Sequence, residues 1–177
     1  MNYGFTKFGL LFTTVKEEDA AFILELRNDP MLSRFLSTTS VDLQQQKEWI
    51  KKYKLREDQN EEVYFICSNT RGSKLGLNRL YNFEDDCFEI GSWLYKPGLN
   101  MSIPILGDLA ARDFGFDILG FKFCKFEVRK KNLSVLRYHL AFKPERIGES
   151  ELDYYFKLSY ESYRQHRNKL LKLLSHG

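Results

Sequence analysis

The sequence predicts a single α/β domain (α+β type) over residues 1–177, built on one mixed β-sheet. The chain of 177 residues has the length of one domain and can bury a substantial core. Its composition, 43% hydrophobic and 15% aromatic, excludes a disordered chain. Short aromatic and β-branched runs alternate with helical patterns, and the sequence contains no internal repeat. Together these features favour helices packed on a sheet.

The N-terminal third is predicted to be largely helical. After a strand over 10–15, Thr14-x-x-Glu17 matches a capping box and begins a helix. Asn28-Asp29-Pro30 ends that helix, because the residue before a proline avoids the helical conformation. A short helix over 31–36 and a polar loop over 37–40 follow. Asp42-x-x-Gln45 then caps a helix over 43–54, with Trp49, Ile50 and Tyr53 facing inward.

The rest of the chain reads as strands with three interposed helices. The charged run 56–62 is expected to be an exposed connection, and the turn formers of 69–73 predict a hairpin. The expected elements are strands over 63–68, 74–83, 87–95, 121–128 and 151–158, and helices over 102–119, 132–140 and 160–174.

Bulk charge and targeting signals point to a cytoplasmic protein. A net charge of +3 is too small to indicate nucleic-acid binding and is compatible with anionic small ligands. The N-terminus lacks the basic region and cleavage site of a secretory signal. No apolar run approaches the roughly 20 residues of a membrane helix. We therefore expect no nucleic-acid partner and no membrane partner.

The cysteines and histidines do not predict a metal site. Cys67, Cys87 and Cys124 are widely spaced in apolar runs, which favours buried, reduced thiols. They form no CxxC pair, and His166 and His176 have no matching ligands nearby in the sequence.

The segment 87–119 is the strongest functional signal. A strand, a short loop and a helix follow one another, and this arrangement often binds phosphate. Free backbone N–H groups and the positive end of the helix dipole both point at the loop. By itself the arrangement is also compatible with a helix start that binds nothing.

The order of elements resembles the GNAT superfamily of N-acetyltransferases. The resemblance rests on LELRNDP at the end of the first helix, EIGSWLY on a central strand, and a short helix ending at Ala141-Phe142. It extends over 10–158 and is nearest to the branch of ribosomal-protein and amino-sugar acetyltransferases. It implies a largely antiparallel mixed sheet with helices on both faces and a V-shaped splay between two central strands.

The resemblance implies acetyl-CoA as co-substrate and no metal. The pantetheine arm would pair with the strand at Trp93, Leu94 and Tyr95, and Gly91 would let that strand bend or bulge. The family's pyrophosphate pattern, Gln/Arg-x-x-Gly-x-Gly/Ala, falls on Leu99-x-x-Ser102-x-Pro104, and all three positions depart from it. The remaining donors are backbone N–H groups over 99–103, that is, of Leu99, Asn100, Met101, Ser102 and Ile103.

Two residues are candidates for the chemistry. Glu89 is a candidate general base, or it points to solvent or pairs with a cation. Tyr138 is a candidate proton donor to the leaving thiolate, or it packs on the last strand. A one-residue slip of the short helix would instead bring His139 to face the site.

Further residues are candidates for binding. Asn132 either contacts the cofactor or only begins the short helix as its N-cap. Arg27 and Asn28, followed by Asp29, either meet the acceptor or end the first helix. The basic, amphipathic last helix packs on the sheet or on a partner subunit in a homodimer, or touches a charged surface.

The predicted function is an acetyl-CoA-dependent N-acetyltransferase acting on a primary amine of a small molecule. A nucleotide-linked amino sugar is the leading acceptor, by resemblance. The first alternative is the N-terminal amine of a protein, as in ribosomal-protein acetyltransferases. The second is a non-catalytic GNAT-fold binding module with a degenerate CoA loop.

Overall fold

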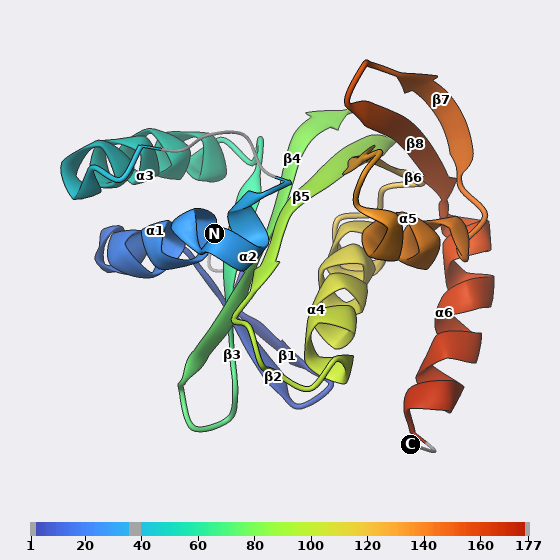
Figure 1. Ribbon diagram of the computed structural model, residues 1–177, viewed down its shortest axis with the longest axis horizontal. Helices are drawn as coiled ribbons and strands as arrows, with labels where there is room; N and C mark the ends of the chain where they lie inside the picture. Colours follow the sequence, from blue (N-terminus) through green and yellow to red (C-terminus); the bar gives the residue numbers. More distant parts are fainter. Residues whose placement is uncertain (1–2, 36–39, 176–177) are drawn as a thin grey trace.

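The computed structural model describes residues 3–35 and 40–175, so the predicted loop residues 37–39 and His176 lie outside the described part. Eight strands form one sheet in the order β1-β2-β3-β4-β5-β6-β8-β7 (Figure 1). In chain order, the elements are β1 (Phe5–Lys7), β2 (Leu10–Thr14), the 3-10 turn η1 (Glu17–Asp19), α1 (Ala20–Asn28), α2 (Pro30–Ser33), α3 (Leu43–Asp58), β3 (Val63–Ser68), β4 (Lys74–Glu84), β5 (Cys87–Tyr95), α4 (Ser102–Asp113), the π-helical segment η2 (Phe114–Ile118), β6 (Phe123–Arg129), α5 (Leu133–Leu140), β7 (Glu145–Glu149), β8 (Asp153–Ser159) and α6 (Tyr160–Leu174).

The predicted mixed, largely antiparallel sheet is confirmed. β5 and β6 pair in parallel, and all other neighbouring strands pair antiparallel. The parallel pair joins the two halves of the sheet, and β5 and β6 separate beyond it (Figure 1). This is the predicted splay between central strands.

Helices cover both faces of the sheet. β3 is buried along its whole length, so its residues alternate between two apolar clusters. Tyr64 and Ile66 pack with residues of α1 and α3. Phe65 and Cys67 pack on the opposite face with residues of α4, η2 and α6. Figure 1 shows α1, α2 and α3 on one side and α4 and α6 on the other, with α5 beside them.

Side-chain caps set several helix boundaries. Asp29 accepts hydrogen bonds from Met31 N (2.8 Å) and Leu32 N (3.2 Å), and Pro30 follows it at the first helical position of α2. Asp42 begins α3 as predicted. The predicted capping box at Thr14 is wrong, because Thr14 ends β2 and the first turn begins two residues later, where Lys16 N–H donates to Asp19 (2.7 Å).

The expected exposed connection at 56–62 is also wrong. α3 runs on to Asp58, and Glu57 and Glu62 are each only 2% exposed. Both carboxylates are buried because the fold supplies them with donors. Tyr53 donates its hydroxyl to Glu57, and Glu62 pairs with Arg56 and Arg79.

Two strands were not predicted. β1 has three residues and is held at the sheet edge by Phe5, whose ring stacks on Phe12 at 4.6 Å. β7 is mostly exposed, so its sequence carries no inward–outward alternation. The predicted helix over 102–119 is present as α4 continued by η2, and α6 has the predicted bounds.

The cysteines are unpaired and buried, as predicted. Among residues 3–35 and 40–175, no group of three or more His, Cys, Asp or Glu side chains could hold a metal ion. Within the same part of the chain, no helix has the length and apolar character needed to cross a membrane.

Candidate active site

A cavity of about 540 Å³ lies where β5 and β6 separate. The two strands pair only at Cys87–Glu89 with Phe123–Lys125. Beyond these pairs, residues 90–94 of β5 and 126–129 of β6 line opposite walls. Residues of α1 and α2 on one face of the sheet, and of α4 and α5 on the other, also line it. The cavity therefore passes through the opening in the sheet.

A β-bulge shapes the β5 wall. Arg79 pairs with Gly91 and Leu77 pairs with Leu94, so Ser92 and Trp93 together face one residue of β4. Ser92 has a positive φ of 49°. The extra residue keeps Leu94 on the α1 side while Trp93 turns to α4.

Gly91 lies in a tight space beside the bulge. A Cβ at Gly91 would lie 3.1 Å from Cε1 of Tyr81. The bulge itself falls on the two residues after the glycine, one position later than the sequence suggested.

The three residues predicted to pair with the pantetheine arm are not equally accessible from the cavity. Trp93 and Leu94 line the cavity. The indole of Trp93 also donates from Nε1 to the carbonyl of Pro104 (2.8 Å), which ties β5 to the start of α4. The Tyr95 side chain is buried, and its hydroxyl donates to Asn78 Oδ1 (2.6 Å).

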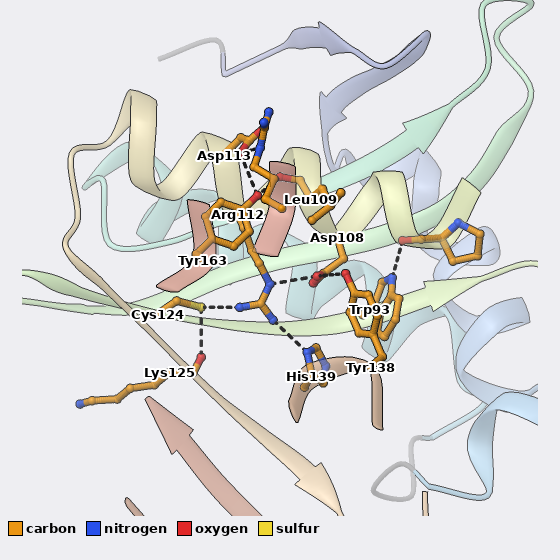
Figure 2. A network of polar contacts seen from close by, with 12 residues as sticks. Trp93, Asp108, Leu109, Arg112, Asp113, Cys124, Lys125, Tyr138, His139 and Tyr163 are labelled. Carbon is orange, nitrogen blue, oxygen red and sulfur yellow. Dashed lines mark hydrogen bonds and ion pairs between the residues drawn. The ribbon is translucent and has the colours of Figure 1, made fainter. Parts of the chain in front are cut away.

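A polar network is buried at the α4 wall (Figure 2). Arg112 is fully buried, and its Nε donates to Asp108 Oδ2 at 2.9 Å. Its Nη1 lies 3.3 Å from Cys124 Sγ, and its Nη2 lies 3.3 Å from His139 Nδ1. Tyr138 donates its hydroxyl to the same Asp108 oxygen at 2.8 Å. The guanidinium of Arg112 therefore links α4, β6 and α5.

Burial and the ion pair together fix the protonation of this network. Burial acts most strongly and lowers the pKa of Arg112, but Asp108, Cys124 and Tyr138 together oppose it, and the pKa is raised on balance. Burial and then Arg112 lower the pKa of His139 well below its ordinary value. Burial, followed by Asp108, raises the pKa of Tyr138 well above its ordinary value, and burial raises that of Cys124 to about 12.

α5 presents His139, not Tyr138, to the cavity. Asn132, Val135 and His139 line the cavity from one face of the helix. Tyr138 lies beside that face, where its ring contacts Trp93 (centroids 5.1 Å) and its hydroxyl is bonded to Asp108. Of these two residues, His139 lines the cavity and Tyr138 does not.

Asn132 begins α5 without capping it through its side chain. It is the N-cap residue, but its side chain accepts no hydrogen bond from the helix backbone. Its Oδ1 instead accepts from Ser134 Oγ at 3.3 Å. Its side chain is therefore available to the cavity that it lines.

Asp108, Glu127 and Asp153 are the acidic residues that line the larger cavity, and the sequence predicted none of them as a site residue. Glu89 does not line the cavity, and Asn82 donates to its Oε2 at 2.5 Å. Glu127 lines it, two positions beyond the last residue of β6 that pairs with β5. Glu127 is exposed on β6, and its carboxylate forms no hydrogen bond or ion pair with any described residue. The alternation along β6, with buried Phe126 and Val128 on either side, could have indicated it.

The environment of Glu127 suits a group that takes up a proton. Burial raises its pKa, and the nearby carboxylates of Asp153 and Glu89 raise it further, while Arg129 opposes them. A carboxyl group with a raised pKa is a stronger base than an ordinary one.

At the predicted phosphate loop, some of the backbone N–H groups at the start of α4 already form hydrogen bonds within the loop itself. Asn100 Oδ1 accepts from Ser102 N (2.9 Å) and Ser102 Oγ (2.8 Å). Ile103 N–H donates to the Asn100 carbonyl at 2.9 Å, and Pro104 has no N–H. Leu99 packs against the core, and Met101 is 74% exposed. This start therefore fits a pyrophosphate less well than a glycine-rich one.

A smaller cavity of about 200 Å³ adjoins the first between α1, α3 and the sheet. Arg27, Arg79 and Ser92 line both. Arg79 is held by Glu62 (Nε to Oε2, 2.6 Å). Asn28 lines neither cavity, and its side chain donates to the carbonyl of Leu24 at 3.0 Å.

Comparisons with known proteins agree with this geometry. The family profile "Acetyltransferase (GNAT) domain" matches residues 9–141. The solved structure of apo FdhC, described as a nucleotide-linked sugar GNAT, is similar with 31% identity and a TM-score of 0.85, over 97% of this chain and 98% of that one. No curated protein sequence matches the chain.

Two more distant structures share the fold. The ribosomal-protein-S5-alanine acetyltransferase of Vibrio fischeri has 14% identity and a TM-score of 0.76, over 92% of this chain and 99% of that one. A spermidine N-acetyltransferase SpeG mutant from Vibrio cholerae has 15% identity and a TM-score of 0.71, over 89% and 97%. With its splayed sheet and the family profile over most of its length, the chain belongs to the GNAT acetyltransferase family.

Proposed function

We propose that the protein is an acetyl-CoA-dependent N-acetyltransferase that acts on a primary amine of a nucleotide-linked amino sugar. The observation that carries the proposal is the splay. Residues 90–94 of β5 have no strand partner on the β6 side and line the cavity of about 540 Å³ there. An extended acyl carrier can pair with such a free strand edge as an added strand does.

The groups that could take part in acyl transfer lie on two different faces of the cavity. Acyl transfer from a thioester needs a neutral amine and donors for the charge that develops on the thioester. On one face, Glu127 is a carboxylate with a raised pKa that can take the proton of the amine. On the other, His139 of α5 lines the cavity and is the candidate donor, while the sequence-predicted donor Tyr138 gives its hydroxyl proton to Asp108. The sequence-predicted base, Glu89, remains a second candidate for the first role.

The acceptor class is supported by charge and by likeness. Arg27, Arg34, Arg79 and Arg129 line the larger cavity, and guanidinium groups suit the phosphates of a nucleotide diphosphate. FdhC, which is similar over nearly the full length of both chains, is described as a nucleotide-linked sugar GNAT. A protein N-terminus is the second acceptor class, and its support is the fold shared with the ribosomal-protein enzyme.

A different function is favoured by the helix start of α4. There, Ser102 and Ile103 direct their N–H groups to Asn100, and Pro104 offers none. A chain that had lost acetyl-CoA would keep this fold as a non-catalytic binding module. The two proposals differ in whether acetyl-CoA binds at all.

Two measurements test the proposal. Acetyl-CoA at 100 times its dissociation constant stabilises a folded protein by about 2.7 kcal/mol, which thermal unfolding detects. No shift at millimolar acetyl-CoA would exclude the enzyme and leave the binding module. Thiol release is then followed with uridine- and thymidine-diphosphate-linked amino hexoses, the same amino hexoses without nucleotide, spermidine, and a peptide beginning with alanine. Faster release with the nucleotide-linked sugars supports the proposed acceptor, and preference for any other amine contradicts it.

A further inference from the structure

The network at the α4 wall determines where the proton of one imidazole lies. Arg112 Nη2 lies 3.3 Å from His139 Nδ1. A guanidinium has only N–H donors and cannot accept a hydrogen bond. His139 Nδ1 must therefore be the acceptor, which means that it carries no proton.

The imidazole is also neutral. Burial and the charge of Arg112 both lower the pKa of His139. A neutral imidazole whose Nδ1 is unprotonated holds its proton on Nε2. The donor of His139 is therefore Nε2–H, and this tautomer cannot act as a base at Nε2.

The guanidinium that imposes this tautomer is itself fixed. Arg112 is fully buried, and Asp108 accepts from its Nε at 2.9 Å. The central carbon of the guanidinium also lies over the ring of Phe126, 4.8 Å from the ring centroid. Asp108 is held in turn by Tyr138 at 2.8 Å (Figure 2). Turning Arg112 away from His139 would break several of these contacts.

The free nitrogen of His139 is open to the cavity. His139 lines the cavity, and its ring lies against Phe126 (centroids 4.6 Å) and Trp93 (5.6 Å). Within residues 3–35 and 40–175, only Asn78 Nδ2 is a fully buried side-chain nitrogen or oxygen without a hydrogen-bond partner. His139 Nε2 has no partner in the same residues, so it is not fully buried, and the cavity is the space that His139 lines.

We propose that Asp108 and Arg112 are positioning residues that hold His139 as a neutral Nε2–H donor toward the thioester during acyl transfer. The inference rests on the proposed function. The amine nitrogen bonds to the carbonyl carbon, the carbon–sulfur bond breaks, and its electron pair stays on sulfur. The surplus proton of the amine leaves to a carboxylate such as Glu127. His139 neither gains nor loses a proton, because its part is to stabilise the negative charge that develops on the thioester.

The tautomer is tested without any substrate. The chain has three histidines, so the ¹⁵N–¹H spectrum of the labelled protein resolves each ring, and His166→Gln assists assignment. We expect a single Nε2–H tautomer for His139 at neutral pH, and a mixture of tautomers in Arg112→Met. If Arg112→Met does not fold, Asp108→Asn, which weakens the hold on Arg112, is expected to change the same signals. An Nδ1–H tautomer or an imidazolium in the native protein would overturn the proposal.

Kinetics test the donor separately. His139→Phe removes the donor and is expected to lower kcat by about 10²–10³-fold, the usual cost of losing one such donor, with little change in KM for acetyl-CoA. His139→Gln, whose amide can still donate, is expected to keep more activity. If the native enzyme transfers acetyl groups and His139→Phe keeps its kcat, the inference fails while the proposed function stands. If the native protein transfers none, the proposed function fails and the catalytic part of the inference fails with it.

Discussion

The Tyr138 hydroxyl donates its hydrogen bond to the Asp108 carboxylate at 2.8 Å, across the space between α5 and α4. The single proton of this phenol is therefore directed at a carboxylate and not at the cavity. Burial and Asp108 also raise the pKa of Tyr138, so the phenol keeps that proton. The role predicted from the sequence, protonation of a leaving thiolate, would require this bond to break first.

Substitution of Tyr138 by Phe is accordingly expected to affect stability more than catalysis. The free energy of unfolding should fall by about 1.5–3 kcal/mol, because a bond to a charged acceptor is lost. We expect kcat to fall by less than about tenfold. Chemical denaturation and steady-state kinetics measure the two effects.

The matched control is Tyr160→Phe, which removes a hydroxyl bonded to Asp117 (2.7 Å) at an exposed position, so its effect on stability should be smaller. If Tyr138→Phe instead lowered the turnover rate by about 100-fold or more, the range of a lost general acid, Tyr138 would be identified as the proton donor.

The two candidate bases are separated by one pair of variants. Glu127→Gln is expected to lower kcat/KM by about 10²–10⁴-fold, the range typical of a lost general base. Glu89→Gln is expected to change it by less than about tenfold, because Asn82 already holds that carboxylate outside the cavity wall.

The pH profile gives an independent readout for the base. A base is active when deprotonated, so activity falls as the pH falls through its pKa. Because burial and the neighbouring carboxylates raise the pKa of Glu127, the acidic limb should lie above the range of an ordinary glutamate. Glu127→Gln should remove that limb. If the acidic limb were retained in Glu127→Gln and lost in Glu89→Gln, Glu89 would be identified as the base instead.

The order of elements was predictable because it depends on local signals. Asp42 acts as the cap that its spacing suggested, α1 ends before Pro30 as predicted, and β3 and β5 contain the aromatic and β-branched residues typical of buried strands. The failures concern partners distant in sequence. Glu62 is buried because Arg79, 17 residues away, reaches it, and no local pattern reports such a contact.

The same limit applies to the site. Glu127 has no motif of its own, and only the separation of β5 from β6 places it in the cavity. Asp108 and Arg112 read as an ordinary ion pair on one helix face, four residues apart, which in most helices is exposed to solvent. Their burial against Cys124 and His139 comes from tertiary packing alone.

The acceptor side can be tested at Arg27, which lines both cavities. If a phosphate of the acceptor pairs with this guanidinium, Arg27→Met should raise KM for a nucleotide-linked amino sugar by about 10–100-fold, as expected for a lost charge-assisted bond. KM for acetyl-CoA should stay unchanged. Arg71→Met, in the exposed turn between β3 and β4, is the control of equal charge. Equal effects of the two variants would contradict a specific contact at Arg27.

Stability should depend on pH through His139. Its pKa in the folded protein lies well below the ordinary value of 6.5, so the unfolded chain binds more protons as the pH falls below about 6.5. The stability associated with neutral His139 is therefore present above that pH and is lost below it, by up to about 1.4 kcal/mol per pH unit.

The groups facing His139 do not obscure this effect. Arg112, Tyr138 and Cys124, which surround the ring with Asp108, have raised pKa values and keep their protons over this range. Denaturation of His139→Gln between pH 7 and 5 should show a flatter dependence than the native protein. His166→Gln should flatten it less, because His166 is only partly buried. Identical slopes for the native protein and His139→Gln would contradict the buried neutral imidazole.

The packing of α4 on β4 and β5 can be tested at Gly107. A Cβ at this position would lie 1.8 Å from the hydroxyl oxygen of Tyr95, which is itself held by Asn78 at 2.6 Å. Gly107→Ala is therefore expected to lower the free energy of unfolding by about 1–3 kcal/mol. Since one kcal/mol shifts Tm by about 2–4 °C in a chain of this size, calorimetry should detect the change.

Two further variants make this test specific. Gly148→Ala places a Cβ at an ordinary 3.5 Å from the Tyr155 ring and should change stability by no more than about 0.5 kcal/mol. Tyr95→Phe removes the hydroxyl oxygen, the nearest of the clashing atoms, and leaves Cζ at 2.4 Å, so Gly107→Ala should cost less in that background than in the native one. If the stability costs of the two substitutions were additive, the contact between Gly107 and Tyr95 would not determine how closely α4 packs on β5. The cavity wall beside Trp93 would then be supported by other contacts.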